Sequence, residues 1–126
     1  MKKIIYSEKA PKPIGPYSQA VEVDNLVFLS GQIGIDPNTG NIVAGGVAAE
    51  TRQVMANIRA VLEKANLTFA NIIKTTIFLS NLADFTEVNQ IYAEYFTKDF
   101  PARSTVEVKA LPKGVKIEIE AIAEKP

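Results

Sequence analysis

Two segments of the chain carry apolar residues at the three-and-four spacing of an amphipathic helix. The first spans residues 47–65, and the second begins near Phe85 and cannot pass Pro101, because proline has no N–H to continue a helix. Around them, six segments are rich in β-branched residues or alternate apolar with polar positions: residues 3–7, 18–23, 26–31, 72–79, 102–110 and 115–123. The order β-β-β-α-β-α-β-β predicts an α+β fold, a mixed sheet with the helices packed on one side.

Local motifs predict how some of these elements begin and turn. Asp84, with Glu87 three residues later, resembles a capping box at the start of the second helix. Leu111-Pro112-Lys113-Gly114 fits a type I turn, and we expect the two strands beside it to pair as a hairpin. A register centred on this turn would bring Arg103 and Glu118 to one face, whereas a slip of one residue would separate them.

The composition predicts a single globular domain covering residues 1–126. Of the 126 residues, 47% are hydrophobic, and 14 Lys and Arg balance 14 Asp and Glu, so no overall positive field favours nucleic acid or an anionic membrane. The N-terminal segment turns polar too soon for a signal peptide, and no apolar run reaches membrane-spanning length, so we expect a cytoplasmic protein. With no Cys and no His, the sequence excludes thiol nucleophiles, histidine-based triads and the usual transition-metal ligands.

Arg103 and two glutamates are the main candidates for chemistry. At the start of a predicted strand, the planar guanidinium of Arg103 could bind a carboxylate through two parallel hydrogen bonds, and a surface salt bridge is the alternative. Glu118 and Glu120 lie two residues apart on one strand face. They could orient a water molecule or neutralise a cation, but alternating Glu and Lys also keeps an exposed strand face soluble. The pattern alone does not choose between these roles.

Further candidates lie in a loop, at a strand end and on the second helix. Tyr17 belongs to a loop with Pro and Gly, where functional residues concentrate. Ser30 and Gly31 end a strand, so a ligand could approach their backbone amides closely, and the Ser30 hydroxyl could donate or accept a hydrogen bond. Asn89 could do both as well, although a single helical Asn is usually solvated.

Several short blocks, spread over nearly the whole chain, carry a family resemblance when they occur together. They are Ile14-Gly15-Pro16-Tyr17, Ser30-Gly31-Gln32-Ile33, Asp36-Pro37 with Thr39-Gly40, Thr51-Arg52-Gln53, Val88-Asn89, Pro101-Ala102-Arg103-Ser104 and Ile117-Glu118-Ile119-Glu120-Ala121-Ile122-Ala123. With these blocks, the chain closely resembles the Rid reactive-intermediate deaminases, also called the YjgF family.

The resemblance implies a chorismate-mutase-like fold, with two helices on one face of a mixed six-stranded sheet. It also implies a homotrimer whose sheets form a central barrel, with ligand clefts between neighbouring subunits. The implied activity is hydrolysis of small 2-imino acids, such as 2-iminobutanoate and 2-iminopropanoate, to 2-oxo acids and ammonia, without a cofactor or a metal. One alternative is a non-catalytic trimer that binds small carboxylates or has a regulatory role. Another, disfavoured by the balanced charge, is a protein that binds or cleaves nucleic acid.

Carried onto this sequence, the resemblance assigns the substrate carboxylate to Arg103 and the attacking water to Glu118. Glu120 would be structural. Many relatives have Cys two residues after the arginine, and here that position is Thr105, which would line the substrate site without supplying a thiol. The positions that line the family's cleft match Tyr17, Ser30, Gly31 and Asn89.

Overall fold

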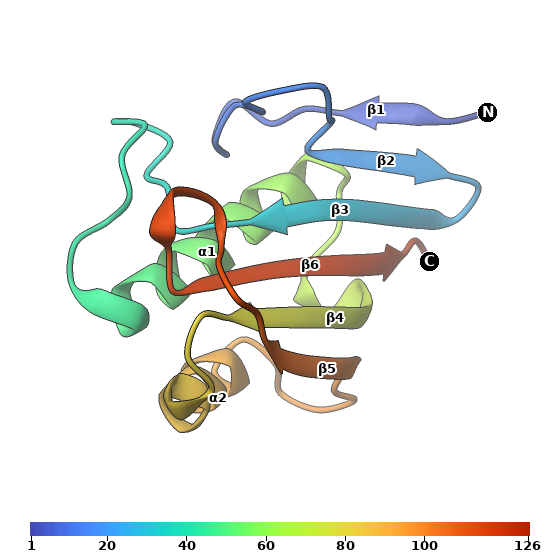
Figure 1. The fold of residues 1–126 in the computed structure, drawn as a ribbon. Coiled ribbons are helices and arrows are strands. Elements are labelled where there is room, and N and C mark those ends of the chain that lie inside the picture. Colours follow the sequence, from blue (N-terminus) through green and yellow to red (C-terminus); the bar gives the residue numbers. More distant parts are fainter.

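The computed structural model describes residues 1–126 and contains one six-stranded mixed sheet backed by two helices (Figure 1). In chain order the elements are β1 (Lys3–Ile5), β2 (Ala20–Val23), β3 (Leu26–Gln32), α1 (Gly46–Lys64), β4 (Ile72–Leu79), α2 (Phe85–Ala93), β5 (Ala102–Glu107) and β6 (Ile117–Glu124). The strand order across the sheet is β1-β2-β3-β6-β4-β5, and only the β4–β5 pair is parallel. The predicted α+β class and the order of elements are confirmed.

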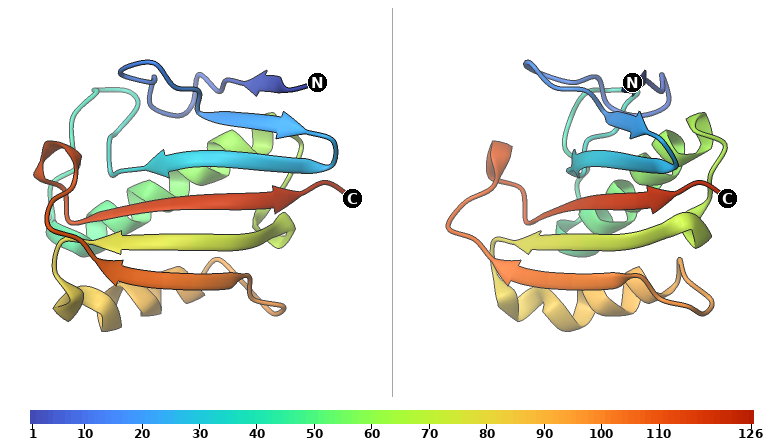
Figure 2. Two further views of the ribbon diagram at one scale, coloured as in Figure 1. Left: turned by 45° about the vertical axis from the view of Figure 1, so that its right-hand side comes forward. Right: turned by 90° about the vertical axis from the view of Figure 1, so that its right-hand side faces the viewer.

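Both helices cover the same face of the sheet, as Figure 2 shows from two further directions. The apolar stripe of α1 supplies buried residues such as Val54 and Ile58, and α2 supplies Val88 and Tyr92. Together with the inward side chains of the central strands, they form one core of 24 buried residues. No helix is long and apolar enough to cross a membrane.

The predicted hairpin between the last two strands is wrong. β6 lies between β3 and β4, and β5 pairs with the far side of β4, so the last two strands are never neighbours. The turn at 111–114 also differs from a type I turn, because Lys113 has φ 57°. β6 takes a central position because its inner face, from Ile117 to Ala123, is only 0–3% exposed. A strand in the centre of the sheet can be buried to this extent, and a strand at the edge cannot.

The predicted capping box at the second helix is wrong as well. Asp84 has helical backbone angles and its side chain caps nothing, because the short 3-10 helix Leu82–Asp84 runs directly into α2. The cap belongs to Asn81, whose side chain accepts a hydrogen bond from the backbone N–H of Ala83. The helix itself starts at Phe85 as predicted, but it ends at Ala93, well before Pro101.

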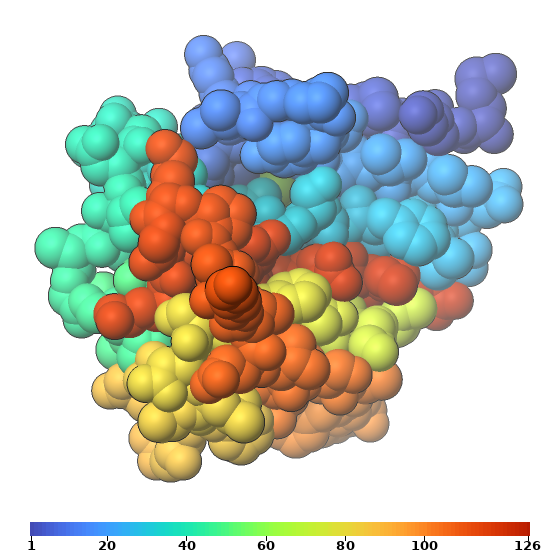
Figure 3. Space-filling model, viewed as in Figure 1, coloured from blue at the N-terminus to red at the C-terminus, as the bar shows by residue number.

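The helices leave the second face of the sheet open. Figure 3 views the molecule from this side, where the N-terminal segment, β3, β6, β4 and β5 lie next to one another. Apolar side chains remain uncovered here, including Phe28 at 44% exposure and Val106 at 42%. These side chains leave apolar surface on this face that no other layer of the chain covers.

Candidate active site

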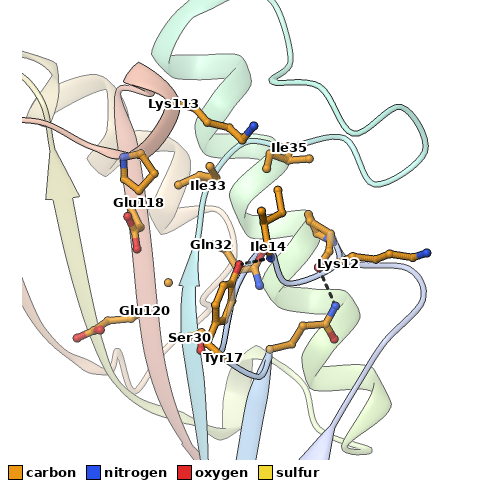
Figure 4. A pocket seen from close by; sticks show the side chains of 14 residues that line it. Lys12, Ile14, Tyr17, Ser30, Gln32, Ile33, Ile35, Lys113, Glu118 and Glu120 are labelled. Atoms are coloured by element: carbon orange, nitrogen blue, oxygen red, sulfur yellow. Dashed lines mark hydrogen bonds between the residues drawn. The ribbon is translucent and has the colours of Figure 1, made fainter.

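A cleft of about 540 Å³ lies on the open face of the sheet. Figure 4 shows it from close by, with Glu118 on one side of the cavity and Tyr17 on the other. The loop before β6, with Pro112 and Lys113, closes one end of the cleft. Of the seven residues proposed from the sequence, four line this cleft: Tyr17, Ser30, Gly31 and Glu118.

A β-bulge places Ser30 and Gly31 in the cleft. The register of β3 on β6 shifts between Leu29 and Gln32, so two residues leave the regular ladder at this point. The space beside Gly31 is filled by the Glu118 side chain: a Cβ built at Gly31 would lie 2.8 Å from the Glu118 carboxyl carbon. The carboxylate of Glu118 therefore packs directly against the bulged backbone, and a larger residue at position 31 would displace this side chain.

Glu118 is the one cleft residue with a perturbed acidity. Burial raises the pKa of the Glu118 carboxyl above its ordinary 4.5, and the neighbouring Glu120 carboxylate raises it further. Glu120 is itself exposed at the mouth of the cleft. A half-buried carboxyl with a raised pKa is a stronger base than an exposed glutamate once it is deprotonated, and it can accept a proton from a water molecule in the cleft.

The opposite wall is an irregular segment, residues 11–17, that holds itself together through its own polar groups. The Tyr17 hydroxyl accepts a hydrogen bond from the backbone N–H of Ile14 at 3.3 Å. The Ser30 hydroxyl donates to the carbonyl of Ser18 at 2.6 Å, so its proton is engaged and its remaining role toward a ligand is that of an acceptor. Ser30 is thus a polar contact and not a nucleophile.

A second cluster gathers around Arg103, between β5 and α2. One guanidinium nitrogen of Arg103 donates to the Asn89 side-chain oxygen at 2.7 Å. The guanidinium carbon also lies 5.2 Å from the ring centre of Tyr92 and 5.5 Å from that of Phe85. Because the rings and one hydrogen bond fix the plane of the guanidinium, its other N–H groups are held ready for a planar anion such as a carboxylate.

Thr105 belongs to this second cluster, two residues along the same strand face. Its hydroxyl oxygen is buried and has no hydrogen-bond partner. An unpaired buried hydroxyl is costly, so it is a group that a ligand could satisfy. The structure therefore brings together Arg103, Asn89 and Thr105, and it separates them from the four residues of the cleft.

The expectation that Arg103 and Glu118 share one face of one sheet is wrong. Arg103 is level with Thr75 of β4, whose hydroxyl is buried against Tyr92 of α2. Glu118 is level with Phe78 of the same strand. Thr75 and Phe78 are three residues apart, so their side chains point to opposite faces, and Glu118 points to the open face. The cause is the missing hairpin, because β4 separates the two strands and its pairing sets their relative orientation. Within a single chain the two side chains cannot act on one small molecule.

The sequence did not indicate several residues that form the cleft. Ile14, Ile33, Ile35 and Lys113 all line it, and the first could have been suspected from its place beside Gly15 and Pro16. The others follow strands or turns with no special pattern. Outside the cleft, the guanidinium of Arg59 lies over Phe69 and Tyr95, with 5.2 Å and 5.4 Å to the ring centres.

Fold and site together define a small α+β protein with a cleft on an uncovered sheet face, lined by Glu118, and with Arg103 held between β5 and α2 at a separate position. The model of the family described as "Endoribonuclease L-PSP" matches residues 7–125 of the chain. The chain belongs to this family, which includes the YjgF and Rid proteins.

Relatives of this chain carry different names. A RutC family protein from Pyrococcus horikoshii is 54% identical over 125 residues, which cover 99% of each chain. The human 2-iminobutanoate/2-iminopropanoate deaminase is 50% identical over 123 residues, 98% of this chain and 90% of the human protein. Among solved structures, the YjgF gene product of E. coli superposes with a TM-score of 0.93 at 50% identity and covers 98% of this chain and 99% of its own.

Proposed function

We propose that this protein hydrolyses small 2-imino acids, including 2-iminobutanoate and 2-iminopropanoate, to 2-oxo acids and ammonia. One observation carries the proposal: each chain presents a carboxyl with a raised pKa in an open cleft and, elsewhere, a guanidinium held flat by two rings and one amide. Human and other mammalian relatives near 50% identity bear the name of this deaminase, which supports the same reaction class here.

The proposed site is shared between two copies of the chain. Arg103 of one subunit would face Glu118 of its neighbour, because the two side chains of a single subunit lie on opposite faces of the sheet. The uncovered apolar side chains of the open face, such as Phe28 and Val106, support an assembly of this kind. We propose a homotrimer with a central barrel and a chorismate-mutase-like fold, in which every interface repeats the same heterologous contact.

In this site Arg103 binds the substrate carboxylate and fixes the C=N bond relative to the neighbour's Glu118. Glu118 accepts a proton from a water molecule as the water oxygen bonds to the carbon of the protonated imine, the C=N π pair moves to nitrogen, and a carbinolamine forms. Glu118 returns this proton to the nitrogen, the C–N bond breaks with its electron pair leaving on ammonia, and the hydroxyl loses its proton to Glu118 as it becomes the carbonyl of the 2-oxo acid. The reaction consumes one water and needs no oxidant or reductant.

A coupled assay with threonine dehydratase tests the proposal, since that enzyme releases the enamine precursor of 2-iminobutanoate. Added protein is expected to accelerate formation of 2-oxobutanoate, and Arg103→Ala is expected to abolish the acceleration while the oligomer, measured by light scattering, stays intact. Wild-type acceleration by Arg103→Ala would refute the role of the arginine. Saturable binding of 2-oxobutanoate without any acceleration would favour the non-catalytic alternative, a small-carboxylate-binding protein.

A second candidate function comes from the family description, which names an endoribonuclease. The cleft is lined by Lys12 and Lys113 as well as by Glu118 and Glu120, so its formal charge is balanced and it presents no basic groove to a phosphate backbone. Incubation of the protein with single-stranded RNA tests this candidate. If the wild type cleaves RNA but hydrolyses no imine, and Glu118→Gln loses the cleavage, the endoribonuclease function would replace the deaminase proposal.

A further inference from the structure

Besides the strand that carries Glu118, two walls of the cleft are irregular chain and not sheet. One wall is the segment 11–17 between β1 and β2, and the other is the segment 33–35 directly after β3. Apart from a single bridge between Ile35 and Ile42, neither wall pairs with a strand. Backbone of this kind has no ladder to hold it, so its position depends on other contacts.

Gln19 holds the first wall from below. Its side chain is 1% exposed and accepts a hydrogen bond from the backbone N–H of Ser7 at 2.6 Å. The amide nitrogen of Gln19 donates to the carbonyls of Ser7 at 3.1 Å, Ala10 at 3.5 Å and Pro11 at 2.9 Å. The Gln19 carbonyl in turn accepts from the N–H of Ser30, so one residue connects the wall to the bulge on the floor of the cleft.

Asn57 of α1 holds the second wall in the same manner. It is also 1% exposed, and its amide nitrogen donates to the carbonyls of Ile33 at 3.1 Å and Ile35 at 3.0 Å. The Asn57 side-chain oxygen accepts from the Gln53 amide at 2.9 Å, which fixes the orientation of the Asn57 amide. The wall is therefore tied to the middle of a long, well-packed helix.

We infer that Gln19 and Asn57 are positioning residues that set the width of the substrate cleft. The carbonyls of Pro11 and Ile35 have no other hydrogen-bond donor, and a buried carbonyl that loses its donor must move to find water. The walls carry Tyr17, Ile14 and Ile33, whereas Glu118 and Arg103 lie on strands. Loss of either amide would thus loosen what contacts the substrate while the reacting groups keep their places.

This inference rests on the proposed function in one respect, namely that the cleft takes the substrate. Its kinetic consequence is a rise in KM with little change in kcat, because binding weakens and the base is undisturbed. A general loss of stability would give another pattern, in which the active fraction and kcat fall together.

The test uses the full-length chain with Gln19→Met and Asn57→Leu, which replace the amides by apolar side chains of comparable size. Each is expected to raise KM for 2-iminobutanoate by about tenfold, a loss of binding comparable to one net hydrogen bond, while kcat changes by less than about twofold. Val61→Ala is the control, because Val61 is fully buried on α1 and lines no part of the cleft. It is expected to lower stability and leave KM unchanged.

A second readout does not depend on catalysis. Amide hydrogen exchange at Ser7 and the affinity for 2-oxobutanoate, followed by NMR, are expected to show faster exchange and weaker binding in Gln19→Met. If the wild type binds this acid but hydrolyses no imine, the proposed function fails and the positioning role is still measured. Should Gln19→Met not fold, Gln19→Glu keeps the acceptor for Ser7 and loses the donors. Unchanged KM and affinity in folded variants, or a fall in kcat alone, would overturn the inference.

Discussion

Replacing Gly31 by alanine is expected to remove Glu118 from the cleft without unfolding the protein. The added methyl group would lie 2.8 Å from the carboxyl carbon of Glu118 and 3.0 Å from its Cγ, both too close for real contacts. The side chain of Glu118 must therefore rotate away. Because the cleft is open, this rotation costs about 1 kcal/mol, the price of one unfavourable rotamer.

The catalytic consequence of Gly31→Ala should be much larger than its effect on stability. A positioned general base contributes about 10²–10⁴-fold, so we expect kcat/KM to fall by at least about 100-fold while the melting temperature changes by a few degrees. The measurements are the coupled imine assay and differential scanning calorimetry. Gly40→Ala is the control: its added methyl group meets nothing within 4 Å, but its φ of 77° strains alanine, so it is expected to lower the melting temperature and leave activity unchanged. Wild-type activity in Gly31→Ala would refute the placement of Glu118 as the base.

Four further changes test the two clusters. Since burial and Glu120 raise the pKa of Glu118, activity should fall with decreasing pH below a midpoint above 4.5, and Glu120→Gln should move that midpoint down in a pH–rate profile; an unmoved midpoint would contradict the coupling. Because the pKa of Glu118 is raised in the folded state, its contribution to stability is fully present below about pH 4.5 and is lost as the pH rises through the folded-state pKa. In denaturant titrations, Glu118→Gln should therefore become more stable relative to wild type as the pH approaches neutral. Asn89→Ala removes the acceptor of Arg103 and should raise KM by about tenfold with the rings still in place, whereas an unchanged KM would show that the rings suffice. Thr105→Val removes a buried unpaired hydroxyl, so it should raise stability by about 1 kcal/mol and, if the hydroxyl contacts substrate, raise KM; a lower melting temperature would contradict this.

The sequence predicted the elements well because their signals are local. The apolar stripes at 47–65 and from Phe85 onward correspond to α1 and α2, and the β-branched run at 72–79 is β4 with the same bounds. Helical and strand periodicity depend on neighbours a few residues away, and those neighbours are visible in the sequence.

The pairing of the strands was not predictable in the same way. Alternation shows that Glu118 and Glu120 share a face of β6, but it says nothing about which strand lies beside β6. The turn at 111–114 looked sufficient for a hairpin, yet the chain inserts β6 between β3 and β4, where its inner face is fully buried. The position of β6 in the sheet depends on contacts between segments that are distant in the sequence. As a result, Arg103 and Glu118 point to opposite faces of the sheet and not to the same face.

The candidate site was therefore predicted as a set of residues but not as an arrangement. Tyr17, Ser30, Gly31 and Glu118 do meet in one cleft, while Arg103 and its partners lie elsewhere. The buried amides of Gln19 and Asn57 were not indicated, because a polar residue within an apolar pattern does not reveal which backbone groups it will bond.

Mixing two inactive variants measures most directly whether the site is shared between subunits. Arg103→Ala and Glu118→Gln chains, carrying different affinity tags, are unfolded together, refolded and purified through both tags in sequence. If the guanidinium of one subunit serves the carboxylate of the next, every mixed trimer regains one intact site, about a third of the wild-type sites, since each intact interface needs its arginine from one variant and its glutamate from the other. Mixed oligomers with no activity above either parent would contradict the shared site and, with it, the proposed mechanism.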